Sequence, residues 1–143
     1  MESDAEKAER LSRGRAVAWP FLGLAVLVAH QGVFFAWNWD NVGILPMVIW
    51  TVLAIGMVAL TLTGGRRLLP KRLRAFAEDE VTRANRDTAI RMGFLAGLIM
   101  SIIVFVVAPF EPLPAQRAAH LIFSMSLGIS FLVFGLRELF SLG

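Results

Sequence analysis

The sequence predicts an all-α integral membrane protein, a four-helix bundle built from two antiparallel transmembrane hairpins. Of its 143 residues, 57% are hydrophobic and 17% are charged, whereas soluble domains carry about 25% charged residues. About 20 helical residues cross the hydrocarbon core of a bilayer. Four apolar runs reach that length, at residues 16–37, 42–63, 92–110 and 118–136. Residues 16–143 are therefore expected to form a single membrane domain after a short cytoplasmic segment, residues 1–15.

The basic residues predict how the four spans are oriented. All fourteen Lys and Arg residues except Arg117 lie before the first run, between the second and third, or after the fourth. Because short cytoplasmic loops carry an excess of Lys and Arg, we expect a multi-pass protein of the bacterial inner membrane with both termini in the cytoplasm. Anionic lipid headgroups are the expected partner of these charges, and nucleic acid is not.

The connections between the runs fit this arrangement. Residues 38–41 form a turn too short for a domain, so the first two spans should make one hairpin. Residues 109–114 contain three prolines, which should end the third span and begin the fourth, giving a second hairpin. Residues 1–15 mix acids and bases and suit a short, fraying surface helix. Pro20 is expected in the first turn of the first span, where proline is tolerated.

The loop 64–91 is the most patterned part of the chain. From Lys71 onward its apolar residues recur every three or four positions, which predicts an amphipathic cytoplasmic helix extending the third span. Acids and bases four residues apart predict ion pairs along that helix, each worth about 0.2–0.5 kcal/mol. The segment suits either a solvated helix extension or a docking surface for a protein partner. The hypothesised docking residues are Arg74, Asp79, Arg83, Arg86 and Asp87.

His30 and His120 are the only titratable residues at depth in the predicted spans. In the expected topology both lie roughly 8–11 Å below the outer surface, at 1.5 Å rise per residue. Two histidines at matching depth could ligate one b-type haem, or contact a metal or quinone. The simpler interpretation is that each is a neutral histidine bonded to a serine or carbonyl of a neighbouring helix.

Small residues mark expected packing faces of the helices. Small residues four positions apart let helix backbones approach closely. Such stripes could pack the bundle internally or join copies of the chain in a homo-oligomer. The serines of the region 124–130 could instead line a path through an oligomeric channel or transporter. The helix-packing residues predicted in this way are Gly93, Gly97, Ser101, Ser124 and Gly128.

Several chemistries lack the residues they need. The chain has no cysteine, which excludes disulfides, thiolate metal sites and cysteine nucleophiles. The predicted spans have no acidic residue away from their ends, whereas proton-coupled transporters use an ionisable group inside the bilayer. No phosphate-binding loop, metal-binding motif or nucleophile elbow occurs in the sequence. We therefore expect no catalytic site and no metal centre.

The stretch Glu78-Asp79-Glu80-Val81-Thr82-Arg83-Ala84-Asn85-Arg86, followed by Ala89–Phe94, resembles a segment of small uncharacterised bacterial four-helix membrane proteins. In them an acidic, Thr-Arg-containing cytoplasmic segment leads into the third span. Some are encoded near small helix-turn-helix regulators, so the resemblance implies a sequestering or sensing role. From the residues and this resemblance together, the expected function is that of a membrane accessory or regulatory protein. Its cytoplasmic helix would dock a partner.

Overall fold

The computed structural model describes residues 4–30, 43–65, 80–111 and 113–141, and nearly all of these residues are helical. Two helical segments, α1 (Asp4–Leu24) and η1 (Ala25–His30), follow one another directly, and η1 is a π-helix. The remaining helices are α3 (Ile44–Thr63), α4 (Glu80–Val107) and α5 (Ala115–Ser141). Four helices are long and apolar enough to cross a membrane, which confirms that part of the predicted fold.

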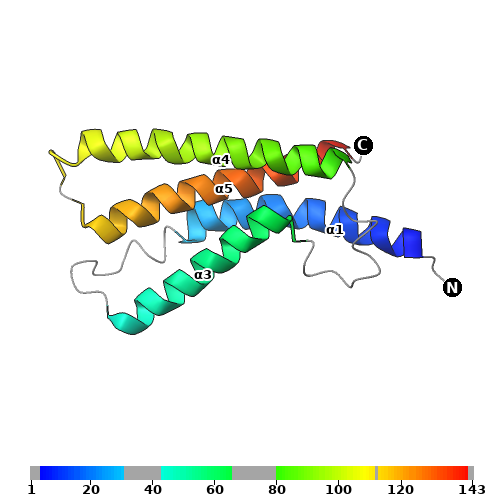
Figure 1. Ribbon diagram of the computed structural model, residues 1–143, viewed down its shortest axis with the longest axis horizontal. Coiled ribbons are helices and arrows are strands. Elements are labelled where there is room, and N and C mark those ends of the chain that lie inside the picture. The colour runs from blue at the N-terminus through cyan, green and yellow to red at the C-terminus, as the bar shows by residue number, and fades with distance from the viewer. Residues whose placement is uncertain (1–3, 31–42, 66–79, 112, 142–143) are drawn as a thin grey trace.

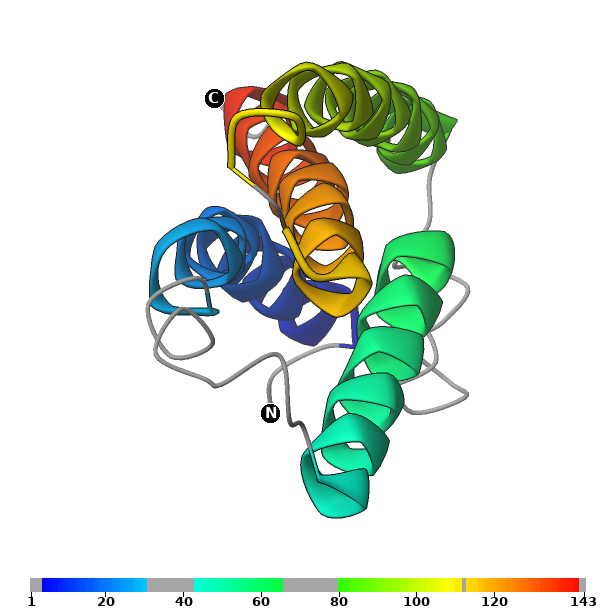
Figure 2. The ribbon, with the colours of Figure 1, turned by 90° about the vertical axis from the view of Figure 1, so that its left-hand side faces the viewer.

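The helix α5 lies at the centre of the arrangement (Figure 2). It packs against α1 and η1 on one side and against α4 on another, while α3 touches it more lightly. Among the described residues, the share of the apolar window that is buried is 44% for α5 but only 6% for α3. The α4–α5 hairpin is closely packed. In contrast, α3 lies against α5 and α4 more than against α1, so the first two spans do not form an equally tight hairpin.

The hydrophobic core joins α1, η1, α4 and α5. Trp19 of α1 packs on two aromatic rings of α5, with centroid distances of 5.1 Å to Phe131 and 5.3 Å to Phe134. Offset and edge-on aromatic pairs of this kind add about 0.5–1.5 kcal/mol beyond the area they bury. Val26 and Ala89 complete the buried cluster.

The helix α1 begins at Asp4, within the stretch 1–15 where a surface helix was expected. It continues without a break into the first predicted span. Glu9 and Arg13, one turn apart, form an ion pair at 3.0 Å that supports this exposed stretch. Pro20 consequently lies inside α1 rather than in a first turn. Its ring sits against Gly135 of α5, where a Cβ atom would fall on the ring.

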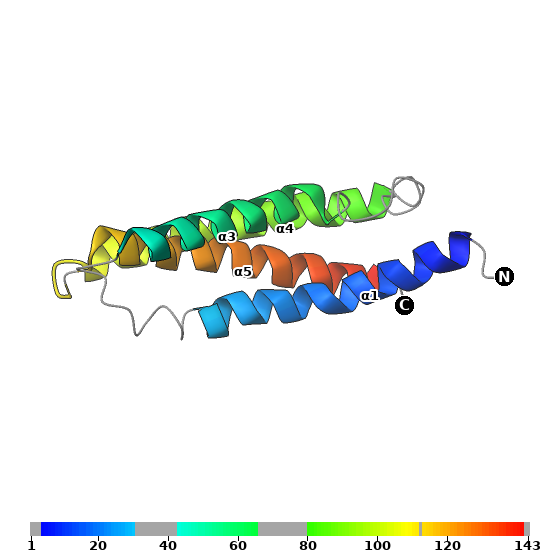
Figure 3. The ribbon, with the colours of Figure 1, turned by 90° about the horizontal axis from the view of Figure 1, so that it is seen from below.

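The ends of the helices divide into two groups. The N-terminus, the C-terminus and the start of α4 all lie at one end of the molecule (Figures 1 and 3). The turn between α4 and α5 lies at the other end. This grouping agrees with the predicted separation of basic segments from the Arg117 connection. Which end faces the cytoplasm stays a prediction.

Candidate functional site: a polar clamp between α4 and α5

A buried acidic residue, Glu138, lies at the end of the bundle that holds both termini. The fourth span was predicted to end at residue 136, but α5 continues to Ser141 and carries Glu138 with it. Only 4% of Glu138 is exposed. Charged side chains are almost never buried to this extent without hydrogen-bonding partners, and near a membrane they are presumed functional until shown otherwise.

The partners of Glu138 come from the first turns of α4. Asn85 donates its side-chain amide to Oε1 of Glu138 at 2.9 Å, and Thr82 donates its hydroxyl to Oε2 at 3.2 Å. Arg137 donates Nε–H to Oδ1 of Asn85 at 3.2 Å. We call these four residues, Thr82, Asn85, Arg137 and Glu138, the polar clamp.

Each group of the polar clamp donates or accepts hydrogen bonds in the direction that its chemistry allows. A carboxylate only accepts hydrogen bonds, and both oxygens of Glu138 do so. The amide of Asn85 donates from its nitrogen and accepts at its oxygen, so this buried side chain uses both functions. Hydrogen bonds to a charged group contribute about 1.5–3 kcal/mol each. The clamp therefore fixes the start of α4 against the end of α5.

Sequence reasoning missed Glu138 because it ended the fourth span too early. A signal was present in the spacing. Buried residues of α5 recur every three or four positions, and the last of them is Glu138. Extending that helical face by one more turn places a carboxylate on the buried side rather than in solvent.

The opposite face of the same stretch of α4 carries exposed charges. Arg83, Asp87 and Arg91 are exposed, and the predicted ion pairs among these three residues do not form. Arg86 is half-buried and lies beside Gly64, where a Cβ would be 3.7 Å from Cδ of Arg86. Arg74 and Asp79, the other two hypothesised docking residues, lie outside the described residues.

Small residues hold α4 and α5 together below the clamp. A Cβ atom at Gly93 would collide with the hydroxyl of Ser130, so only glycine fits there. A Cβ atom at Gly97 would lie 3.3 Å from Cβ of Ser126, a tighter contact than is usual. The Gly93 stripe thus lies inside the chain's own α4–α5 interface.

The other predicted packing residues lie elsewhere on α5 and α4. Gly128 faces η1 and the end of α1, and a Cβ there would lie 2.5 Å from Cγ of Leu27. Ser124 is buried, and its hydroxyl donates back to the carbonyl of His120. Ser101 is half-buried and donates to the carbonyl of Gly97 at 2.8 Å.

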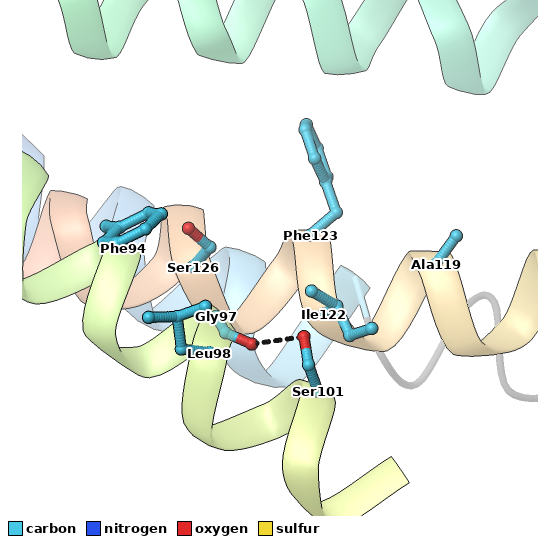
Figure 4. Close-up of a pocket in the computed structure, with 8 residues that line it drawn as sticks. All are labelled: Phe94, Gly97, Leu98, Ser101, Ala119, Ile122, Phe123 and Ser126. Atoms are coloured by element: carbon cyan, nitrogen blue, oxygen red, sulfur yellow. Dashed lines mark hydrogen bonds between the residues drawn. The ribbon is translucent and has the colours of Figure 1, made fainter. Parts of the chain in front are cut away.

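A groove of about 490 Å³ opens where α4 and α5 diverge beyond the glycine stripe (Figure 4). Ser101 donates its hydroxyl to its own helix, and Ser126 supplies the other hydroxyl of an otherwise apolar lining. Phe123 projects from α5 toward α3 (Figure 4). The groove is lined by Phe94, Gly97, Leu98, Ser101, Ala119, Ile122, Phe123 and Ser126.

His120 contacts α3 rather than a second histidine in the part of the chain that is described. Only 2% of His120 is exposed, and its Nδ1 accepts a hydrogen bond from Nε1 of Trp50 at 3.0 Å. A neutral imidazole that accepts at Nδ1 carries its proton on Nε2. A haem ligand normally donates from one ring nitrogen and binds iron with the other, so this tautomer favours a structural role for His120. The side chain of His30 lies outside the described residues.

Within residues 4–30, 43–65, 80–111 and 113–141, no group of three His, Cys, Asp or Glu side chains could hold a metal ion.

Comparison with known proteins adds no relative to this description. Family models, curated proteins and solved structures gave no match to the chain. Its resemblance to small bacterial four-helix membrane proteins therefore stays a prediction. What the geometry itself establishes is an all-helical protein with four candidate membrane spans, centred on α5 and clamped at one end.

Proposed function

We propose that this protein is a non-catalytic accessory or regulatory protein of the bacterial inner membrane that binds a protein partner through the first three turns of α4. The observation that carries the proposal is the contrast between the two faces of that segment. One face is fixed to α5 by the polar clamp. The other presents Arg83, Asp87 and Arg91 to solvent without ion pairs among them.

A rigid base makes such a surface suitable for recognition. Holding α4 in place before a partner arrives lowers the conformational entropy lost on binding. Exposed charges of both signs select a partner with the complementary order of charges and disfavour others by repulsion. Anionic lipid headgroups suit the arginines but not Asp87, so the mixed face favours a protein over a lipid surface as its partner.

The charge order also bears on the kind of partner. Two copies of this chain in one membrane share an orientation, so a two-fold axis along the membrane normal would bring equivalent faces of α4 together in parallel. That arrangement sets Arg83 opposite Arg83 and Asp87 opposite Asp87, which is repulsive. A different protein is therefore the proposed partner, and the Glu80–Arg91 stretch contributes its half of the interface.

Photocrosslinking in cells tests this proposal. A photoreactive amino acid at Arg83 or Asp87 is expected to give one discrete adduct, whereas the same probe at the exposed Glu111, at the opposite end of the bundle, should give none of that size. Reversing the unprobed charge, with Asp87→Arg beside a probe at 83, should abolish the adduct while membrane insertion is retained. Absence of an adduct at both positions, or an adduct that survives charge reversal, would contradict the proposal.

A further inference from the structure

The helix α3 contacts the rest of the protein along one face. Its one buried residue among those described is Ala54, which lies on that face between two attachments, while the adjacent residues of α3 are exposed. Met57 and Leu60 touch the core from the half of α3 that leads to Gly64. The other half is held near α5 by Trp50. The two attachments differ in kind, which gives α3 a fixed end and a releasable end.

The fixed end is a pair of glycines in the left-handed conformation. Gly64 has φ of 56° and Gly65 has φ of 72°, values that side-chain-bearing residues rarely adopt. Both are buried, and they lie against the core: a Cβ at Gly65 would be 3.4 Å from Trp19, and a Cβ at Gly64 would be 3.7 Å from Phe134. Glycine pairs absorb changes of backbone angle more easily than other residues, so this is the natural pivot of α3.

The releasable end is held by the side chain of Trp50. Trp50 donates Nε1–H to Nδ1 of His120 at 3.0 Å, and its ring centroid lies 5.4 Å from that of Phe123. Within the described residues, no other side chain of α3 hydrogen-bonds to a neighbouring helix. Thr51, Thr61 and Thr63 all donate to carbonyls of α3 itself.

The position of this bond connects α3 to the groove between α4 and α5. Phe123 both stacks near Trp50 and lines the groove. We propose that α3 is a hinged helix that pivots at Gly64–Gly65 and is latched by the Trp50–His120 hydrogen bond. When the latch opens, the Trp50 end of α3 swings away from α5 and releases Phe123 at the margin of the groove. Opening breaks one neutral hydrogen bond and the ring contact between Trp50 and Phe123, so we expect the open form as a minor population.

Paired spin labels measure this motion directly, since the chain has no native cysteine to remove. One label pair, at Val48 and Gln116, spans the latch end. A second pair, at Leu62 and Leu139, spans the pivot end. All four residues are exposed. In lipid nanodiscs, Trp50→Phe should shift the Val48–Gln116 distances to longer and broader values and leave the Leu62–Leu139 distances unchanged.

Two further variants separate the latch from other effects. His120→Leu removes the acceptor and should reproduce the shift, whereas Thr51→Val removes a hydroxyl that bonds only within α3 and should change neither distance. Unchanged Val48–Gln116 distances in Trp50→Phe would overturn the latch. Equal lengthening at both pairs would overturn the pivot, and a shift in Trp50→Phe but not in His120→Leu would overturn the hydrogen bond as its cause.

Discussion

The helices α5 and α3 are both apolar in sequence, but they differ in how much of their surface is buried. Both are apolar and long enough to span a bilayer, yet the buried share of the window is 44% in α5 and 6% in α3. Small residues that neighbouring helices approach closely lie on α5, at Gly128 and Gly135, whereas Gly56 of α3 has no neighbour within 4 Å of its would-be Cβ. Apolarity and length thus determine which segments are able to cross a membrane. Close packing depends on where small residues meet a partner helix.

The core ring of Phe131 should give the largest difference between the two helices. Phe131 is 1% exposed, so Phe131→Ala leaves a cavity, and we expect a loss of about 3–5 kcal/mol in the free energy of unfolding. The matched change on α3, Ile55→Ala, removes a side chain that is 65% exposed and should have little effect. Unfolding by titration with a denaturing detergent measures both. Equal losses of unfolding free energy in the two variants would show that α5 and α3 do not differ in packing.

The polar clamp should give the next largest effect. Glu138→Ala removes the acceptor of the buried amide of Asn85 and one acceptor of the half-buried hydroxyl of Thr82. A buried unsatisfied group costs about 1–3 kcal/mol. Glu138→Gln keeps the volume and one acceptor oxygen, so its loss should be smaller. The same unfolding titration compares them with Glu111→Ala, which removes an exposed acid. A Glu138→Ala variant as stable as Glu111→Ala would show that the clamp does not fix α4.

The glycine contacts should give a smaller but still measurable effect. Gly135→Leu would place side-chain atoms on the rigid ring of Pro20, and overpacking of this kind costs about 1–3 kcal/mol. Gly56→Leu on α3 adds the same atoms into open space and should be neutral or slightly stabilising, because leucine favours helix. Proteolysis rates of the two variants in detergent provide the comparison. Faster proteolysis of Gly56→Leu than of Gly135→Leu would reverse the assignment of the two faces.

Hydropathy and charge placement predicted the class of the fold, because both are properties of single segments. Four long apolar helices, with termini and the α4 start at one end, follow from runs of residues and from the positions of Lys and Arg. The order of packing around α5 did not follow. It depends on contacts such as Pro20 with Gly135, which join residues far apart in the chain and leave no periodic signal within either segment.

The candidate site likewise has one part that the sequence predicted and one part that it did not. The exposed charges of α4 were identified from spacing alone, although the pairs expected among Arg83, Asp87 and Arg91 did not form. The buried half of the site, Asn85 with Glu138, was not predicted. A carboxylate just beyond the expected end of a span is normally solvated, and only the longer helix α5 places Glu138 in the interior. The bond between Trp50 and His120 links residues 70 positions apart. The sequence therefore predicted a bond from His120 to a neighbouring helix, with a serine or carbonyl as partner, but did not indicate Trp50.

The most direct test of the account is a lipid-accessibility scan of α3 and α5. Single spin labels are placed along Ile44–Thr63 and along Ala115–Ser141 in nanodiscs, and relaxation by oxygen reports contact with the hydrocarbon phase. We expect high accessibility around most of α3, with protection confined to the face that carries Trp50, Ala54 and Met57. We expect broad protection along α5. A protected stripe on α3 as wide as that on α5 would contradict the central place of α5 and the hinged role of α3.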